Sequence, residues 1–363
     1  MNIIASTNAY ETWLGKQTRI DEADLNKKHS DMSQSAFVFL RATYYRWAQL
    51  WPKRCKTLAE APAVLAVGDL HVENFGTWRD AEGRLAWGIN DFDETCHMSY
   101  ANDLVRLAVS ASLAIKASHL SLSLPEACKA TVRGYSDGLR NGGKAFVLSE
   151  EHGWLRAPAV GSLRDPVVFW KNMDAIPSIE GAIPEGAVEA LRHIMPNDGL
   201  EFRVIHRTAG EGSLGRMRFV GIANWHGAQI AREAKALIPS AYLWANESEG
   251  PFEVYYTTVL SRAVRCPDPF LGTRSQWVVR RLAPDCSRIE VAQLAPIKDE
   301  IRLMNAMGFE AANIHLGSVG AVKAVVKHLS KLPKNWLIEA VETMEDAVVS
   351  DWNAWKKGNS KGG

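Results

Sequence analysis

Oxygen-bearing side chains with catalytic potential gather in one stretch near the start of the chain. Asp69 and Asn74 are five positions apart, and Asp91 and Asp93 follow soon afterwards. A carboxylate can orient a hydroxyl and accept its proton, and magnesium prefers oxygen ligands such as carboxylates and amide carbonyls. These residue types predict that Asp69 accepts a proton beside a metal site formed by Asn74 and Asp91, with Asp93 as a second acidic ligand.

Short strands are expected to position these residues. Residues 64–67 form an apolar run typical of a buried strand, and the run delivers Asp69 just beyond its end. Residues 75–78 and 85–89 are rich in strand formers, and the residues between them favour a reversing turn. The resulting hairpin ends at Asp91, so we expect the oxygen ligands at the ends of consecutive strands.

The spacing within the loop strengthens this interpretation. In the catalytic loop of protein kinases, the catalytic aspartate and the metal-binding asparagine are also five positions apart. There the carboxylate positions the attacking hydroxyl, while the amide oxygen helps to hold magnesium against the phosphates. The series of strand, loop, hairpin and acidic pair favours a functional site over a chance match. His71 is a second candidate catalytic residue that contacts the loop or supports Asp69, and the alternative is a structural histidine.

A glycine-rich turn lies far downstream. Gly210, Gly212 and Gly215, with Ser213 among them, have a spacing shared by dinucleotide-binding turns and by the phosphate loops of kinases. Strand-like patterns lie on both sides of the turn, whereas a dinucleotide-binding turn opens a helix. Glycines allow backbone N–H groups to approach phosphate oxygens closely. The setting favours a phosphate-binding loop, with a plain hairpin as the alternative.

The strand after this turn carries two cations, Arg232 and Lys235. Because they are three positions apart, their side chains should point to opposite faces of a sheet. Either cation suits a phosphate, so the sequence leaves open which one faces the cleft, or whether both are surface charges. Glu253, near the start of a predicted helix, is a candidate ion-pair partner.

Composition narrows the function classes. Lys and Arg together number 42 and Asp and Glu 41, so net charge indicates neither a nucleic-acid partner nor a membrane partner. The five cysteines lack paired spacing, which favours reduced thiols over a disulfide framework. The first residues do not resemble a secretory signal, and no long apolar run is present. We therefore expect a cytoplasmic protein.

Hydrophobic patterns predict a helical beginning, a middle rich in strands and a helical end. The early helices are expected over residues 33–50, 103–117 and 125–139. Between residues 155 and 199, proline and glycine leave one plausible helix, over 186–194, and a boundary near 197–199. Strands are expected over 201–208, 216–224, 228–235 and 276–282. The later helices are expected over 252–264, 297–307, 310–316, 319–332 and 336–355.

Taken together, the motifs resemble the bacterial family called domain of unknown function 2252, over nearly the whole chain. The resemblance is carried by residues 36–41, 68–76, 90–94, 103–107 and 210–215. That family is similar to aminoglycoside and choline phosphotransferases of the kinase-like superfamily, whose catalytic loop reads His-Gly-Asp-x-His-x-x-Asn. Two positions depart from the pattern. Val67 replaces the first histidine, and Arg232 stands where the family often has lysine before Glu-Ala.

The resemblance implies a circular permutation, because kinase-like chains place the glycine-rich turn before the catalytic loop. Permutation requires original termini that lie close together and a cut in a tolerant loop. The implied fold is α+β, two-lobed and protein-kinase-like. It has a mostly helical catalytic lobe over 1–198, a smaller antiparallel-sheet nucleotide lobe over 199–295, and C-terminal helices over 296–363 that return to the catalytic lobe. Residues 311–315 resemble the helix that precedes the catalytic loop in ordinary phosphotransferases.

The function implied by the resemblance is ATP- and magnesium-dependent transfer to a hydroxyl of an unidentified small molecule or protein. Phosphoryl transfer is the expected reaction, with nucleotidyl transfer also open. A metal-dependent phosphoesterase is a second class, since Gly68-Asp69-x-His71 resembles a first metal motif, but that class requires further ligands. A third class is a non-catalytic, pseudokinase-like regulator that binds nucleotide.

Overall fold

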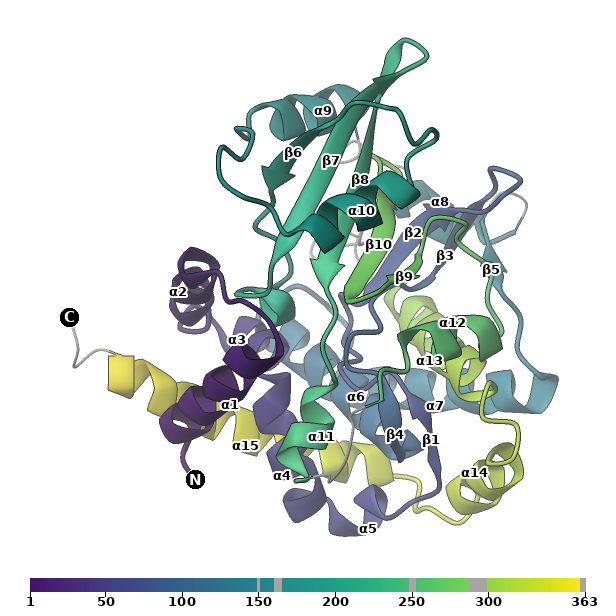
Figure 1. The fold of residues 1–363 in the computed structure, drawn as a ribbon. Coiled ribbons are helices and arrows are strands. Elements are labelled where there is room, and N and C mark those ends of the chain that lie inside the picture. The colour runs from purple at the N-terminus through teal and green to yellow at the C-terminus, as the bar shows by residue number, and fades with distance from the viewer. Residues whose placement is uncertain (149–150, 160–164, 248–252, 287–298, 360–363) are drawn as a thin grey trace.

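A five-stranded antiparallel sheet stands above a larger, mostly helical region, and most of the predicted site residues lie where the two meet (Figure 1). This computed structural model describes residues 1–148, 151–159, 165–247, 253–286 and 299–359. We call the two parts the sheet region and the helical region. The mixed α+β architecture agrees with the predicted class. The boundary predicted at residues 295–296 lies outside the described residues.

The strands of the sheet region run in the order β6-β7-β8-β10-β9, each antiparallel to its neighbours. Their bounds are Arg203–His206 (β6), Arg218–Trp225 (β7), Ala228–Ala236 (β8), Gly272–Arg274 (β9) and Trp277–Leu282 (β10). A two-residue turn joins β7 to β8, and both of its residues have positive φ, which matches the right-handed twist of a hairpin. Four of these strands confirm the predicted ones, and β9 is additional.

Helices cover both faces of this sheet. On one face, α10 (Glu185–His193) packs Leu191 into a cluster with Phe219, and on the other, α9 (Pro166–Asp174) packs Met173 into a cluster with Val220. Residues 219 and 220 point to opposite faces because side chains alternate along a strand. α9 and α10 lie before the boundary predicted near residues 197–199, but they pack with the strands that follow that boundary.

The single helix predicted between residues 155 and 199 is confirmed as α10, but α9 and the end of α8 (Gly153–Ala159) also lie in this range. The prediction treats the prolines of this segment as helix breakers. Pro166 is the first residue of α9, where a missing N–H is tolerated and a fixed φ favours the helix. The side chain of Asp165 caps this end by accepting from the Val167 amide at 2.7 Å.

α6 (Tyr100–Lys116) forms the centre of the helical region and is buried from Tyr100 to Ala114. It contributes to one large apolar core that includes residues from both ends of the chain. The other helices are α1 (Ile3–Gln17), α2 (Glu22–Asp31), α3 (Ala36–Ala42), α4 (Tyr44–Arg54), α5 (Lys56–Ala59), α7 (Leu124–Asn141), α8 (Gly153–Ala159), α11 (Ala241–Ala245), α12 (Tyr256–Arg262), α13 (Glu300–His315), α14 (Val322–Leu329) and α15 (Trp336–Asn359).

Several predicted helix bounds differ from the structure. The helix expected over residues 33–50 is two helices, α3 and α4, because Thr43 leaves the helical conformation and its hydroxyl donates to the Phe39 carbonyl oxygen at 2.7 Å. The two helices expected over 297–307 and 310–316 are one, α13. Residues 252, 297 and 298 of the predicted helices lie outside the described residues.

Two small antiparallel sheets position residues 67–74, which we call the catalytic-loop sequence after the motif that they resemble. One pairs β1 (Ala63–Ala66) with β4 (Cys96–Ser99), and the other has the order β2 (Phe75–Arg79), β3 (Leu85–Ile89), β5 (Phe146–Val147). The pairing confirms the predicted strand and hairpin. Since both sheets connect the same two loops, residues 67–74 and 90–95 lie side by side.

The C-terminal helices pack on the helices formed by the first half of the chain. α13 lies against α7, and two glycines permit the close approach, since a Cβ at Gly134 would stand 1.8 Å from the Asn305 carbonyl oxygen and one at Gly308 2.1 Å from that of Thr131. α15 lies along α6 and α4, where Arg46 pairs with an aspartate of α15 at 2.6 Å. Figure 1 shows the yellow end of the chain beside its purple beginning.

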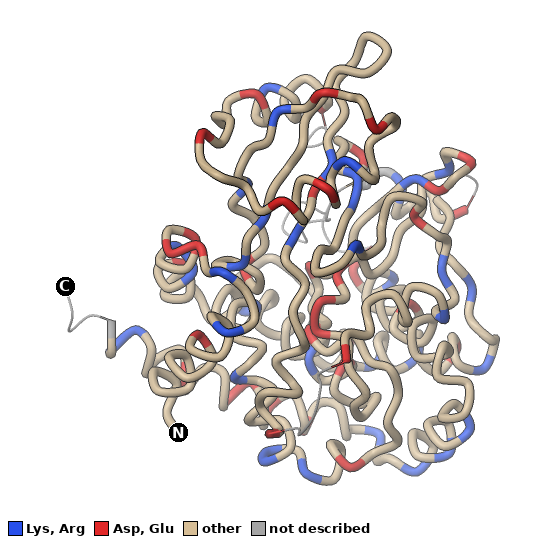
Figure 2. The backbone as a smooth tube through the Cα atoms, in the orientation of Figure 1, with Lys and Arg blue, Asp and Glu red and all other residues tan. Residues whose placement is uncertain are grey.

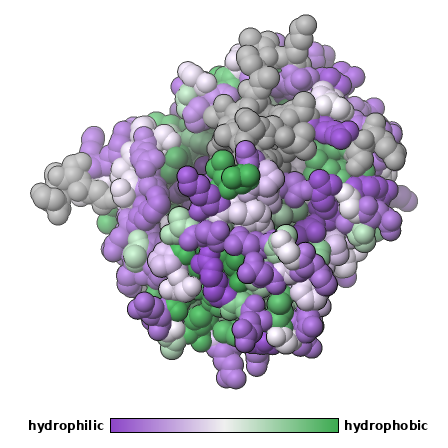
Figure 3. Space-filling model, turned by 90° about the horizontal axis from the view of Figure 1, so that it is seen from above, coloured by the Kyte–Doolittle hydropathy of each residue, from purple (hydrophilic) through white to green (hydrophobic). Residues whose placement is uncertain are grey.

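All five cysteines are free thiols, which confirms the prediction from their spacing. Within the described residues, no helix combines the length and the apolar character needed to cross a bilayer. Acidic and basic residues lie close together where the two regions meet (Figure 2). The face seen from above is mostly hydrophilic, with apolar residues in small groups (Figure 3).

The contact between α7 and α13 yields a stability prediction. Gly134→Ala should lower the free energy of unfolding by about 2–3 kcal/mol, because the added methyl forces the two backbones apart. Gly153→Ala is the matched control, since a Cβ there meets nothing within 4 Å. Urea unfolding measures both variants. Equal stability of Gly134→Ala and wild type would show that the helices do not approach this closely.

A buried carboxyl, Glu310, yields a pH prediction. Its oxygens accept from the Ile89 amide at 3.3 Å and from Asn313 at 2.7 Å, but burial outweighs these bonds and raises its pKa from 4.5 to about 7. The folded protein therefore holds this proton more tightly than the unfolded chain does. Its contribution to stability is present below pH 4.5 and is lost as pH rises through about 7.

Glu310→Gln stays neutral, so its stability relative to wild type should rise by about 3 kcal/mol between pH 4 and pH 8. Unfolding by urea across this range measures the difference, and the exposed Glu342→Gln serves as control. If wild type and Glu310→Gln show parallel pH profiles, the carboxyl is not held protonated in the fold.

Candidate functional site

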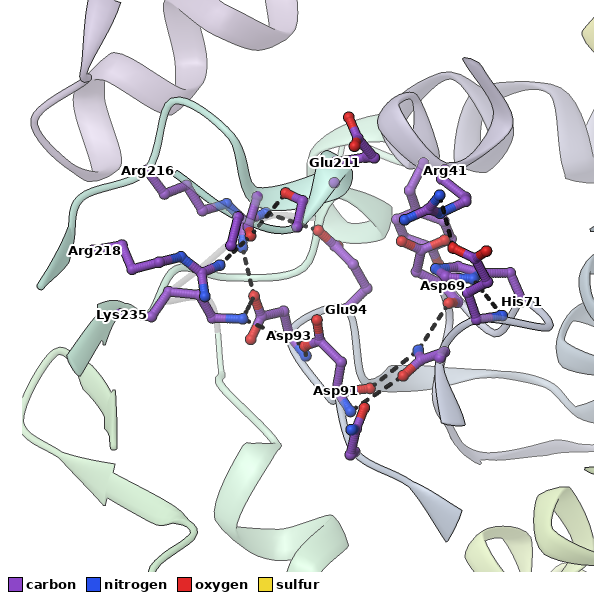
Figure 4. Close-up of a pocket in the computed structure, with 18 of the residues that line it drawn as sticks. Arg41, Asp69, His71, Asp91, Asp93, Glu94, Glu211, Arg216, Arg218 and Lys235 are labelled. Carbon is purple, nitrogen blue, oxygen red and sulfur yellow. Dashed lines mark hydrogen bonds and ion pairs between the residues drawn. The ribbon is translucent and has the colours of Figure 1, made fainter. Parts of the chain in front are cut away.

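A cavity of about 360 Å³ lies between the sheet region and the helical region (Figure 4). It brings together segments more than a hundred residues apart in sequence. The predicted site residues that line it are Asp69, His71, Asn74, Asp91, Asp93, Gly210, Gly212, Ser213 and Lys235. Gly215 and Arg232 are the predicted residues that do not line it.

The backbone before Asp69 is fixed by a carboxylate of α6. Asp103 is fully buried and accepts from the amides of Val67 at 2.7 Å and Gly68 at 2.9 Å. Gly68 has φ +82°, and a Cβ there would stand 2.3 Å from the Glu94 carbonyl oxygen. Only glycine fits this turn, because any other residue would adopt a strained backbone conformation and its Cβ would clash with this oxygen. The same carboxylate is 3.0 Å from a ring nitrogen of His315 on α13.

Asp69 is held by a buried arginine that sequence reasoning missed. Arg106 Nε lies 2.7 Å from Asp69 Oδ1, and Nη2 bonds the same oxygen. The guanidinium is fully buried, about 5 Å from the ring centres of Tyr44 and Trp47, and also donates to the Leu40 carbonyl oxygen. Since both bonds use Oδ1, Oδ2 remains available toward the cavity. Arg106 lies within the motif at residues 103–107, and that motif is the sequence feature that could have identified it.

The environment of Asp69 suits proton transfer. Burial raises the pKa of its carboxyl to about 7, against the opposing effect of Arg106. A group with a pKa near neutrality can both accept and release a proton efficiently. Gly212 approaches from the sheet region, where a Cβ would be 3.4 Å from Asp69 Oδ2 and 3.2 Å from the Arg41 carbonyl oxygen.

Asn74 joins the two loops of the helical region. Its Nδ2 donates to the carbonyl oxygens of Asp69 at 3.0 Å and Asp91 at 3.3 Å, and its Oδ1 accepts from the Asp91 amide at 3.1 Å. The side chain therefore holds the register of the loops. A carbonyl oxygen has two lone pairs, so Oδ1 keeps one position for a metal ion.

His71 braces its own loop. Its Nδ1 accepts from the Glu73 amide at 3.2 Å, and Glu73 in turn pairs with Arg41 at 2.8 Å. The ring is mostly buried and lines the cavity. This contact with the loop is one of the two roles considered for His71.

Asp91 and Asp93 share the cation of Lys235. Lys235 Nζ lies 2.5 Å from Asp93 and 3.4 Å from Asp91, and Arg216 lies 3.2 Å from Asp93. Burial tends to raise the pKa of Asp91, but Lys235 and the nearby arginines 280 and 218 outweigh it and hold the value at about 2. Burial and the neighbouring Asp91 raise the pKa of Asp93. The cations therefore keep Asp91 ionised, whereas Asp93 holds its proton more tightly than a free carboxyl does.

One oxygen of this pair has no partner. Asp93 Oδ1 is buried and makes no hydrogen bond with any described residue. An unsatisfied buried carboxylate oxygen is costly and uncommon in folded proteins. Together with the exposed oxygens of Asp91, it forms an acidic oxygen set that fits a magnesium ion.

The glycine-rich turn is shaped by backbone that favours glycine. Gly210 has φ +78° and Gly215 has φ +92°, and a short 3-10 helix, η2 (Glu211–Ser213), lies between them. Ser213 Oγ accepts from Arg218 at 2.6 Å. Gly210, Gly212 and Ser213 face the cavity, whereas Gly215 packs on Leu25 of α2.

α2, which the sequence did not predict, supports the turn from outside the cavity. The Asp21 amide donates to the Gly215 carbonyl oxygen at 3.0 Å, and the buried Lys28 donates to that of Gly212 at 3.4 Å. Burial lowers the pKa of Lys28 to about 8. These long-range contacts leave no local pattern in the sequence.

The structure separates the two cations of β8 as their spacing required. Lys235 enters the cavity. Arg232 lies on the opposite face of the sheet, where its Nε donates to the Ile194 carbonyl oxygen at 2.9 Å and its guanidinium stacks 4.4 Å from the Phe270 ring. Arg232 therefore does not reach the site. Glu253 is exposed and outside the cavity, so the acidic partners of Lys235 are Asp91 and Asp93.

Further functional residues escaped prediction. Arg216 bonds Glu94 at 2.9 Å as well as Asp93, which ties the glycine-rich turn to the acidic loop. Arg218 lies directly opposite Lys235 in the β7–β8 ladder and so shares its face. Pairing the two predicted strands through their turn would have revealed Arg218, because register fixes the face of each side chain.

Comparison with known proteins supports part of the resemblance. Neither a curated protein nor a solved structure matches the chain. A match to one family covers residues 19–155, a range that includes the catalytic-loop sequence and the acidic pair but ends before the glycine-rich turn. The kinase-like relation and the permutation stay predictions. Over residues 19–155, the chain matches the family described as an uncharacterized protein conserved in bacteria (DUF2252).

Proposed function

We propose that the protein is an ATP- and magnesium-dependent phosphotransferase that acts on a hydroxyl. The observation that carries the proposal is the shared cavity, in which Asp69, the pair Asp91 and Asp93, and the glycine-rich turn with Lys235 meet. Phosphoryl transfer needs a group to orient the acceptor, oxygen ligands for metal, and a cation with backbone amides for the phosphates. Residues suited to each of these roles line the same cavity.

The acidic pair and Asn74 would hold the metal ion, which neutralises charge on the phosphates when bound. Asp93 Oδ1, buried without a described partner, is the observation that supports this fit. Asp91, with a side chain 45% exposed, faces the cavity beside it. Lys235 holds the two carboxylates together and offers a point charge for a phosphate oxygen.

The remaining roles follow from the geometry around Asp69. Its Oδ2 would accept the hydrogen bond of the acceptor hydroxyl, because Arg106 occupies Oδ1. Arg106 orients the carboxylate and is a positioning residue. Gly212 keeps the space beside Oδ2 open, and the turn can aim backbone amides at phosphate oxygens.

The arrangement of elements supports the kinase-like comparison. The glycine-rich turn joins the first two strands of the sheet, and Lys235 lies on the third, β8, as the phosphate-binding lysine does in protein kinases. The packing of α13 and α15 on the helices formed by the first half of the chain supports the permuted order.

A second candidate is a nucleotide-binding protein without catalytic activity. It is favoured by the ion pair between Lys235 and Asp93, because this pair engages the lysine and the carboxylate that phosphoryl transfer would need for the phosphates and for the metal ion. The phosphoesterase alternative gains no such support. Within the described residues, the one cluster of three metal-ligating side chains consists of Asp21, Asp24 and His206, which lies between α2 and β6 and outside the cavity.

The catalytic proposal predicts the effect of Asp69→Asn. This variant keeps the size of the side chain but removes the proton acceptor, so turnover should fall by about 10²–10⁴-fold while nucleotide affinity stays within a few fold. Labelled ATP with magnesium and a panel of hydroxyl acceptors measures turnover, and fluorescence titration measures binding. Wild type that binds ATP without any turnover would support the non-catalytic candidate instead.

The metal proposal predicts that Asp93→Asn weakens magnesium-dependent ATP binding at least about tenfold, because one anionic ligand is lost. Asp91→Asn, which alters the more exposed member of the pair, should act in the same direction. Calorimetry with and without magnesium measures the effect, and Asp137→Asn on the outer face of α7 is the control. Magnesium-dependent binding that is equal in all four proteins would contradict the site.

A further inference from the structure

Three arginines surround one glutamate on the wall of the cavity formed by the sheet region. Glu233 on β8 is 1% exposed and pairs with Arg207 at 3.1 Å, Arg218 at 2.8 Å and Arg280 at 2.7 Å. All three arginines line the cavity, and Glu233 lies beneath them. The roles proposed for the glycine-rich turn and for Asp91 and Asp93 do not explain why three arginines gather here.

The cluster carries unbalanced positive charge. Three guanidinium groups share a single carboxylate, whereas Lys235 is already paired with the acidic loop. Burial, and to a smaller extent arginines 280 and 218, lower the pKa of Arg207 against the opposing effect of Glu233. An anion in the cavity would offset the positive charge that Glu233 leaves. Arginines 280 and 218 also lower the pKa of Asp91, so the cluster lies next to the pair Asp91 and Asp93.

The donors needed to bind an anion are present. Arg207 and Arg280 have side chains 33% and 27% exposed, and each makes one hydrogen bond, to Glu233, among the described residues. A guanidinium has five N–H groups in a planar fork, so most of them stay available. This fork matches the paired oxygens of a phosphate.

Glu233 holds the arginines in place. In the sheet it lies opposite Val220 of β7 and Arg280 of β10, so the register of three strands fixes its position. The arginines lower the pKa of its carboxyl far below the usual range despite burial, so it remains ionised. Arg218 also donates to Ser213 at 2.6 Å, which connects the cluster to the glycine-rich turn.

We infer that Arg207, Arg218 and Arg280 form a phosphate subsite next to Lys235, which binds part of the polyphosphate of the nucleotide. The identity of the ligand as a nucleotide rests on the proposed function. The ability of the three arginines to bind a phosphate anion does not. The subsite implies selectivity by phosphate number, because a chain of phosphates can contact more of these cations at once than a single phosphate can.

Inorganic tripolyphosphate, without magnesium and without an acceptor, is the probe, since it presents linked phosphates without a nucleoside and therefore reports phosphate binding alone. We expect wild type to bind tripolyphosphate more tightly than orthophosphate, with affinity that falls as salt increases. Arg207→Gln and Arg280→Gln should each weaken binding about tenfold or more, because each loses a charge-assisted bond. Arg280→Lys should restore part of the affinity by restoring the charge.

Arg281→Gln is the matched control, because this neighbour on β10 does not line the cavity and bonds the Arg79 carbonyl oxygen instead. Circular dichroism and thermal melting confirm that each variant is folded. Tripolyphosphate binding that is unchanged in the Arg207→Gln, Arg280→Gln double variant would overturn the subsite, even if wild type transfers phosphate from ATP. Arginine-dependent binding of tripolyphosphate with neither ATP binding nor turnover would keep the subsite and overturn the proposed function.

Discussion

The carboxylate of Asp103 is the interaction on which the site depends. It is fully buried, and it accepts from the backbone amides of Val67 and Gly68 while also contacting Asn102 and His315. Buried amides without partners would cost free energy comparable to a lost hydrogen bond. One side chain of the central helix therefore fixes the turn that precedes Asp69, and it connects that turn to α13.

Buried ion pairs then join the two regions across the cavity. Arg216, next to the glycine-rich turn, bonds Asp93 and Glu94 of the helical region, and Lys235 of the sheet bonds Asp91 and Asp93. Charges of this kind lose hydration when buried, so they add less to stability than their short distances suggest. Instead, these pairs fix the orientation of the sheet region, since each pair forms only when the sheet region lies over residues 90–95 in one orientation.

Local patterns predicted the elements around Asp69 well, because alternation, turn residues and strand formers act over a few positions. The same patterns gave the opposite faces of Arg232 and Lys235 without indicating which one enters the cavity, since that depends on what packs on each face of the sheet. They missed the helix that begins at Pro166, because proline suits a first turn as well as a break. Local patterns also could not predict that α2 supports Gly215, because contacts between residues distant in sequence produce no periodic pattern.

The reach of His315 to Asp103 has a consequence for how the protein is made. The loop that holds Asp69 is synthesised more than 200 residues before the helix that carries His315. At about 5–20 residues per second, the interval between them is roughly 10–50 s. During that time the surface of α7 that receives α13, which includes Gly134, lacks its cover. The nascent chain thus exposes this surface until α13 has been synthesised, and this is the stage at which a chaperone would protect it.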